Sequence, residues 1–177
     1  MEGVDMHFFA RKGQIVVTDL ILGSLVFVVA ILAFYRAEVN LQEVASRELA
    51  DVQLEAGIVA DALYSRGYPP AWTNATVTDM GITENSRVNV TKLAQLRAMQ
   101  YNQTRNIFRT KYDYYFYYEQ NDGPTWIDAG VQEGIGKPGV NSTNILTVEN
   151  PEQLARIIRF VIYNGAPHRM VVYVWKP

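Results

Sequence analysis

The chain contains no cysteine among its 177 residues and only two histidines, His7 and His168. The absence of cysteine excludes disulfide bonds, thiol nucleophiles, iron–sulfur clusters and cysteine-ligated zinc. Two histidines that lie far apart in the sequence also argue against a histidine-rich metal site or a serine–histidine–aspartate triad. No P-loop or nucleophile-elbow motif occurs. We therefore expect no catalytic residues, no cofactor and no metal, and we predict that the protein is not an enzyme.

Charge is also scarce, since 19% of the residues are charged and the formal net charge is −2. Nucleic-acid binding in bulk needs a surplus of cations that neutralise phosphates, so this composition argues against it. Hydrophobic residues make up 49% of the chain. That share excludes intrinsic disorder and is sufficient for a packed core.

A long apolar run near the N-terminus is the most informative feature. From Gln14 to Tyr35 the chain has 22 residues with one charge, Asp19. A helix of this length, rising about 1.5 Å per residue, reaches about 33 Å and can cross a bilayer. A core helix of a soluble protein would show polar residues at every third or fourth position. We therefore predict a transmembrane helix over 14–35.

The residues on either side of the run indicate how it is processed. Cleavage by ordinary signal peptidase needs small residues at the far end, and Tyr35-Arg36-Ala37 does not supply them. At the near end, Arg11-Lys12-Gly13-Gln14 followed by IVVTDLILGSLVFVVAILAF resembles the class III signal peptide of archaeal type IV pilins and archaellins. The resemblance implies that a prepilin peptidase cuts between Gly13 and Gln14 and leaves a leader of residues 1–13 in the cytoplasm.

Asp19 departs from the pattern of that family. Bacterial type IV pilins and many archaeal relatives carry a glutamate at the fifth position after the cut, whereas this chain has Thr18 there and Asp19 at the sixth. One interpretation is that Asp19 pairs with the new α-amino group of a neighbouring subunit, in the low dielectric of the membrane. The other is that Asp19 lies at the headgroup level in the first helical turn, where the helix dipole favours an acid.

Four Asn-x-Thr sequons follow the membrane segment, at Asn74, Asn89, Asn102 and Asn141. Such sequons accept N-linked glycans in exported proteins. Lysine and arginine are only weakly biased across the segment, so the sequons, which exceed chance, carry the prediction of topology. We expect a single-pass membrane protein whose C-terminal part is glycosylated and lies outside the cell.

The helix is expected to continue beyond the membrane to residue 66, because no proline interrupts it. Gly67-Tyr68-Pro69-Pro70 then ends it. Apolar residues recur along it at three- and four-residue steps, namely Leu41, Ala45, Leu49, Val52, Ala56, Val59 and Leu63. A second apolar line through Leu54 and Ile58 leaves two alternatives: the helix packs only on its own head, or it also contacts a neighbouring helix in a filament.

Residues 67–177 are predicted to form an extracellular α+β head. We expect a helix over 89–108, an aromatic strand over 112–119, a turn at 121–124 and a short strand at 145–148. A β-hairpin is expected over 155–163 and 168–175, around Asn164-Gly165. The predicted fold class is α+β, with the long N-terminal helix packed on a small antiparallel β-sheet. The segments GYPPAWTNATVTDMGI, NVTKLAQL and KYDYYFYYE also resemble landmarks of small archaeal pilin-like proteins.

The aromatic strand is one candidate contact surface. Strand alternation places Tyr114 on one face, together with Tyr112, Phe116 and Tyr118, and places Tyr115 and Tyr117 on the other. One face is expected to be core. For the other, three interpretations are open: a subunit interface, a platform on which sugars stack, or rings covered by a loop.

A basic stretch without acids lies between Glu84 and Asp113 and includes Arg105 and Arg109. It is a solvated face, or it docks on the acidic upper helix of its own or a neighbouring subunit, or it attracts DNA. The docking alternative follows from the charges, because residues 36–66 carry more acids than bases.

A helix that is half in the membrane and half attached to a head is the plan of type IV pilins. The resemblance implies a structural subunit, major or minor, of a pilus-like surface filament. It also implies four kinds of partner: a prepilin peptidase, an assembly ATPase with its membrane platform, membrane lipid, and other pilin subunits. The alternative is a membrane-anchored surface glycoprotein that acts as an adhesin or sensor and does not polymerise.

Overall fold

The computed structural model describes residues 6–120, 123–125 and 134–176, with side chains from Val17 onward except that of Val148. The chain divides into two compact units, Met1–Ser46 and Arg47–Pro177. The turns of the first helix from Arg47 onward therefore belong to the same compact unit as the head. Two residues of the predicted turn, Asn121 and Asp122, lie outside the described residues.

The first helix, α1, runs from Met6 to Tyr64. It begins before the predicted start at Gln14 and ends two residues before the predicted end at residue 66. The chain leaves it through Gly67, whose φ of 72° is a left-handed conformation that glycine adopts readily. In the second unit one stripe of α1 has no exposed surface, consisting of Val52, Ala56, Val59, Ala60 and Leu63.

The head contains one mixed β-sheet in the order β1-β2-β6-β7-β3-β4, with β5 also paired to β3. The strands are β1 Thr83–Glu84, β2 Arg87–Val88, β3 Asp113–Gln120, β4 Gly123–Thr125, β5 Ile135–Gly136, β6 Leu154–Tyr163 and β7 Ala166–Trp175. The prediction of an antiparallel sheet is wrong for one pair, because β2 lies parallel to β6. The amide of Ile162 donates to the carbonyl of Ser86 (2.8 Å), which fixes that pairing.

Two predictions of local structure are corrected. The helix expected over 89–108 is two helices, α2 Val90–Arg97 and α3 Tyr101–Phe108, because Gln100 adopts an extended conformation (ψ 143°) and starts a new helix. The strand expected at 145–148 is a short helix, α4 Ile145–Val148. Its entry is bent by Asn141, whose Oδ1 accepts the amides of Thr143 and Asn144 (3.0 and 2.8 Å).

The predicted hairpin is confirmed, and its two strands form the centre of the sheet. Strands β6 and β7 pair from Leu154 opposite Trp175 to Tyr163 opposite Ala166. Asn164 and Gly165 form the turn with φ values of 49° and 80°, as a two-residue hairpin requires. On its other side β7 pairs with the aromatic strand β3 over seven residue pairs, from Asp113 to Glu119.

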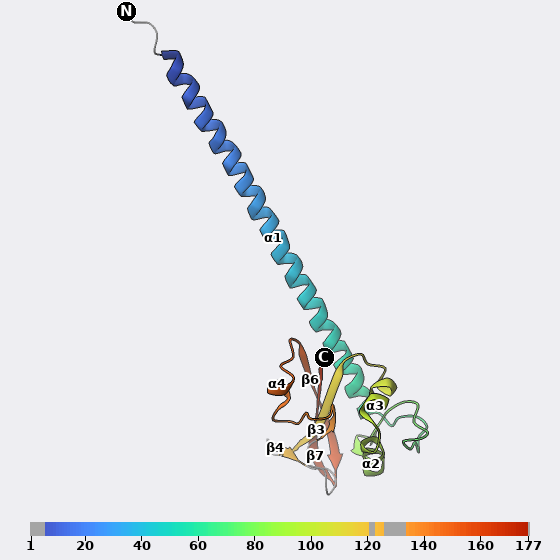
Figure 1. Cartoon of the computed structure of the whole chain (residues 1–177). Coiled ribbons are helices and arrows are strands. Elements are labelled where there is room, and N and C mark those ends of the chain that lie inside the picture. Colours follow the sequence, from blue (N-terminus) through green and yellow to red (C-terminus); the bar gives the residue numbers. More distant parts are fainter. Residues whose placement is uncertain (1–5, 121–122, 126–133, 177) are drawn as a thin grey trace, which may run out of the picture. The chain divides into compact units, whose positions relative to one another are not determined.

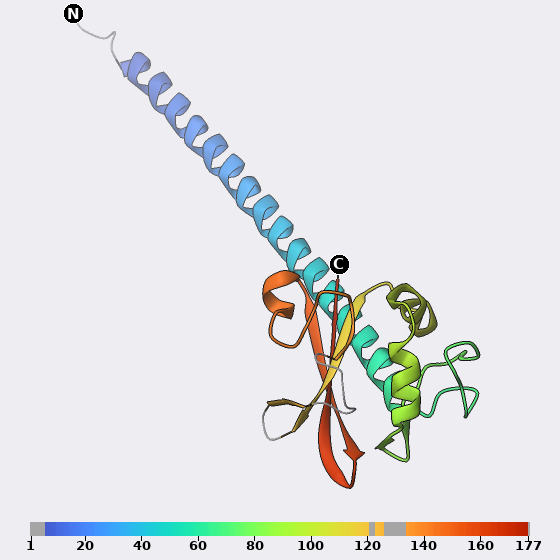
Figure 2. The ribbon, with the colours of Figure 1, turned by 60° about the horizontal axis from the view of Figure 1, so that its bottom comes forward.

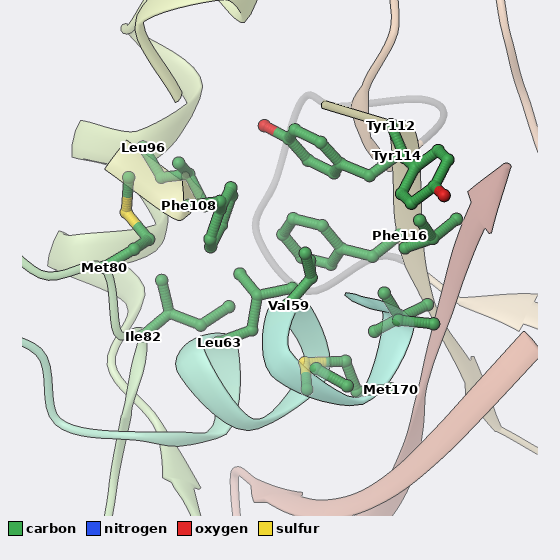
Figure 3. Close-up of a cluster of buried hydrophobic side chains, with 14 of the residues drawn as sticks. Val59, Leu63, Met80, Ile82, Leu96, Phe108, Tyr112, Tyr114, Phe116 and Met170 are labelled. Carbon is green, nitrogen blue, oxygen red and sulfur yellow. The ribbon is translucent and has the colours of Figure 1, made fainter. Parts of the chain in front are cut away.

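Around β3 and β7 the sheet is buried on both faces. A front cluster joins α1, α2 and α3 to the sheet, and Figure 3 shows Val59 and Leu63 of α1 beside Phe108, Phe116 and Met170. A back cluster on the other face consists of Tyr115, Tyr117, Val140, Ile145, Val171 and Trp175. In Figures 1 and 2, α4 lies on the opposite side of the sheet from α2 and α3. The head is therefore three layers deep around β3 and β7.

The hydroxyl of Tyr118 is buried in the front cluster without a hydrogen-bond partner in the described part of the chain. An unpaired buried hydroxyl loses its hydration without compensation, so Tyr118→Phe is expected to raise the free energy of unfolding by about 1 kcal/mol. Tyr114→Phe is the matched control, because the Tyr114 hydroxyl bonds to Thr104 and its loss is expected to lower stability. Urea titration of both variants checks the signs, and a loss of stability in Tyr118→Phe would contradict this account.

Candidate membrane and assembly surfaces

The apolar part of α1 has no packing partner in the described structure. Every large hydrophobic side chain between Val17 and Tyr35 is at least half exposed, on all sides of the helix. One helix near the N-terminus is thus long and apolar enough to cross a membrane. This agrees with the predicted transmembrane segment in length and composition.

The residues of the predicted cleavage site lie within this helix. The backbone of Arg11, Lys12, Gly13 and Gln14 is helical in α1, and their side chains lie outside the described part. Asp19 is an exposed acid among exposed apolar side chains. Because α1 begins at Met6, Asp19 is well inside the helix of the uncut chain, whereas after a cut at Gly13 it would be the sixth residue, in the second helical turn.

The four sequons differ in how their side chains are used. Asn74 and Asn102 are exposed. Asn89 caps α2, where its Oδ1 accepts the amide of Lys92 (3.2 Å), and Asn141 forms the turn before α4. These bonds use the side-chain oxygen, whereas an N-linked glycan is attached to Nδ2. Among the described residues, none accepts a hydrogen bond from Nδ2 of these four asparagines.

The tyrosines predicted as a possible interface are buried within a single head. Tyr114 is fully buried in the front cluster, and Tyr115 and Tyr117 are 1% and 6% exposed in the back cluster. Val140 and Ile145 cover the back pair. Of the three interpretations, rings covered by a loop is therefore the one that fits, and the rings offer no surface to a sugar or a second subunit.

The two arginines of the basic stretch bind acids of the head rather than of the helix. Arg105 pairs with Asp113 (3.3 Å), and Arg109, which is largely exposed, stands 3.8 Å from Asp79. Acids of α1 are paired with other cations: Asp61 with Arg159 (2.7 Å) and Glu48 with Lys176 (3.1 Å). Within one copy, Arg159 and Lys176 therefore pair with acids of α1, whereas Arg105 and Arg109 pair with acids of the head.

A buried ion network lies at the N-terminal end of β3. Asp113, 3% exposed, accepts from Lys137 (2.8 Å) on one oxygen and from Tyr101 (2.7 Å) on the other. Glu149 bonds to the same ammonium and accepts from Trp175 (3.2 Å). Burial disfavours the charged form of Lys137, but the two carboxylates outweigh it and raise its pKa. The network ties β3, the loop after β5 and the end of α4 together.

The loop that supplies Lys137 has the spacing Gly134-x-Gly136-x-x-Gly139, which sequence reasoning missed. In dinucleotide-binding proteins this spacing joins a strand to a helix and contacts phosphate. Here β5 pairs with β3, and a Cβ at Gly136 would lie 2.3 Å from the carbonyl oxygen of Tyr114. Gly136 is therefore required because the backbones of β5 and β3 lie too close together to leave room for a side chain. The loop borders an open cavity of about 240 Å³, which is also lined by Arg97 and Thr104.

The described residues contain no group of three or more metal-ligating side chains. No protein-family model matches the chain, and the comparisons found no significant match to a curated protein or to a solved structure. What the fold itself defines is a class: an α+β head built on the later turns of a long N-terminal helix whose earlier turns are exposed and apolar.

Proposed function

We propose that the chain is a structural subunit of an archaeal type IV pilus-like surface filament, inserted in the membrane by residues 14–35 and cut between Gly13 and Gln14. The observation that carries this proposal is a change along one helix. Over Val17–Tyr35 the apolar side chains of α1 point in all directions, whereas from Val52 onward a single apolar stripe fills the core of the head.

That change suits a helix with two environments. Before assembly the lower turns are surrounded by lipid, where a helix satisfies its own backbone hydrogen bonds. In a filament the same turns pack against the helices of other subunits. Lipid is as apolar as those helices, so the transfer gains little hydrophobic free energy, and close packing must supply the attraction. Assembly therefore also needs an ATPase and a membrane platform as partners.

Cleavage has a chemical role in this proposal. Cutting after Gly13 removes Arg11 and Lys12 and creates an α-amino group at Gln14. A carboxylate in low dielectric is stabilised by a nearby cation. Asp19 of one subunit is the acid placed to receive the α-amino group of its neighbour.

The intact mass and the N-terminal residue of the protein test this proposal. The full chain is produced in an archaeal cell that has a prepilin peptidase and in one that lacks it. We expect a chain that starts at Gln14 only in the first cell. Gly13→Ala keeps a small residue at the cut and is expected to be processed, whereas Gly13→Val is expected to leave residues 1–13 in place and to abolish filaments seen by electron microscopy.

A chain that begins at Met1 in both cells would overturn the proposal. A chain cut at Gln14 that remains monomeric would instead support the second candidate, a surface glycoprotein that acts as an adhesin or sensor. Exposed Asn74 and Asn102 are the sequon residues that favour a glycosylated head in either case, and the same mass measurement shows any added sugar.

A further inference from the structure

Two apolar side chains are exposed on the back face of the sheet. Phe160 is 68% exposed and Ile158 is 36% exposed, and the two are alternate residues of β6, so they point to the same face. Arg159, between them, points the other way and donates to Asp61 of α1 (3.0 and 2.7 Å). Ile158 and Phe160, here called the strand patch, therefore face away from α1.

A second pair is exposed on the front of the head. Leu54 is 66% exposed and Ile58 is 48% exposed, one helical turn apart on α1. The neighbouring residues Val52, Ala56 and Val59 are fully buried against the sheet. Leu54 and Ile58, here called the helix patch, therefore face away from the sheet, and the two patches lie on opposite sides of one head.

The two patches have rims of opposite charge. Asp51 and Glu55 lie within one turn of the helix patch, and the nearest cation on that stripe, Arg47, is two turns before Leu54. On the sheet, Arg156 precedes Ile158 on the same face and Arg169 lies directly opposite Phe160. These two guanidinium groups share one carboxylate, that of Glu119 (3.4 and 3.2 Å), which is itself 12% exposed.

We propose that a second copy of this chain docks its helix patch on the strand patch of the first. Apolar pairs meet at the centre, and the acidic rim of the helix faces the basic rim of the sheet. The contact is heterologous, because one copy contributes its helix patch and the other copy contributes its strand patch. Patches on opposite sides of a head repeat the contact from copy to copy rather than closing it into a dimer, which is how open helical assemblies arise. This inference rests on the proposed function and names the head surfaces that a filament would use.

The absence of cysteine makes this contact directly testable by disulfide cross-linking. Two full-length, membrane-anchored variants, Ile58→Cys and Phe160→Cys, are produced in the same cell and oxidised. A disulfide needs Cα atoms within about 7 Å, so mixed dimers form only where the two patches meet. The matched control replaces Phe160→Cys with Leu146→Cys, which is 63% exposed on α4 and lies outside both patches.

We expect at least tenfold more mixed dimer for positions 58 and 160 than for positions 58 and 146. The double variant, Ile58→Cys with Phe160→Cys in one chain, is expected to give a ladder of multimers, because its two thiols are on opposite sides of the head. Glu55→Arg is expected to reduce the cross-link at least tenfold, and Arg156→Glu in the partner chain to restore it.

Dimers linked mainly 58 to 58 or 160 to 160 would overturn the proposal in favour of a closed, symmetric contact, and yields equal to the control would overturn it altogether. Electron microscopy and N-terminal sequencing of the same cells separate the two proposals. Filaments of processed chain without the 58–160 link leave the proposed function standing and remove this interface. Unprocessed chain without filaments removes the proposed function, and the cross-link alone then decides the contact.

Discussion

Replacing Asp113 with alanine is expected to lower the free energy of unfolding of the head by about 2–3 kcal/mol. The carboxylate is 3% exposed and serves Lys137, Arg105 and Tyr101 together. Its removal leaves the hydroxyl proton of Tyr101 without an acceptor in a half-buried site, whereas Lys137 loses one of its two carboxylates and keeps its bond to Glu149. The unpaired phenol and the weakened hold on the ammonium together account for the expected loss. Urea unfolding of the full chain in detergent micelles measures the change, with Trp72 and Trp175 as buried fluorescent probes.

Glu48→Ala supplies the matched control for this prediction. Glu48 also pairs with a lysine, Lys176, but both side chains are more than 40% exposed. Water solvates each partner after the other is removed, so the expected loss is below about 1 kcal/mol. Equal losses in the two variants would mean that burial of the Asp113 network does not determine its contribution.

The elements that the sequence predicts well are those whose signal is local. The long helix follows from an uninterrupted apolar and amphipathic pattern, and the hairpin follows from Asn164-Gly165, whose positive φ values set the turn and hence the register of β6 on β7. The aromatic strand is similarly local, because bulky β-formers follow one another from Tyr112 to Tyr118.

The ion network could not be predicted in the same way. Asp113, Lys137 and Glu149 are far apart in the sequence, and they meet only because β5 pairs with β3 and the chain then returns through α4. The parallel pairing of β2 on β6 is equally non-local and rests on strands of two residues, which are too short to show a period.

The burial of both faces of β3 is a third feature that the sequence does not predict. Alternation correctly separates Tyr115 and Tyr117 from Tyr114, but it does not say what covers each face. The back pair is covered by Val140 and Ile145 in a segment rich in glycine and asparagine, which carries no apolar period. The sequence predicts a strand over 145–148, where the structure has α4, and it does not indicate that Val140 and Ile145 belong to the core.

Stability is expected to fall steeply above pH 10, through the buried tyrosines. Burial raises the pKa of Tyr114 and of Tyr118 well above the ordinary value of about 10. Between the unfolded and the folded pKa the unfolded state has lost protons that the folded state keeps, so raising the pH favours unfolding. Each phenol then removes up to about 1.4 kcal/mol per pH unit, or about 3 kcal/mol per unit for the pair. Below pH 10 their contribution is complete.

Other groups of the head act in the same direction. Burial raises the pKa of Tyr101, and its hydrogen bond to Asp113 adds to the shift; the carboxylates around Lys137 raise the pKa of that ammonium. Urea unfolding at intervals between pH 8 and 11.5 measures the slope. In Tyr118→Phe one of the two phenols is absent, so the slope above pH 10 is expected to decrease by about 1.4 kcal/mol per pH unit while stability at pH 8 rises. A slope equal in both proteins would show that Tyr118 ionises in the folded head, and thus that its hydroxyl is hydrated rather than buried without a partner.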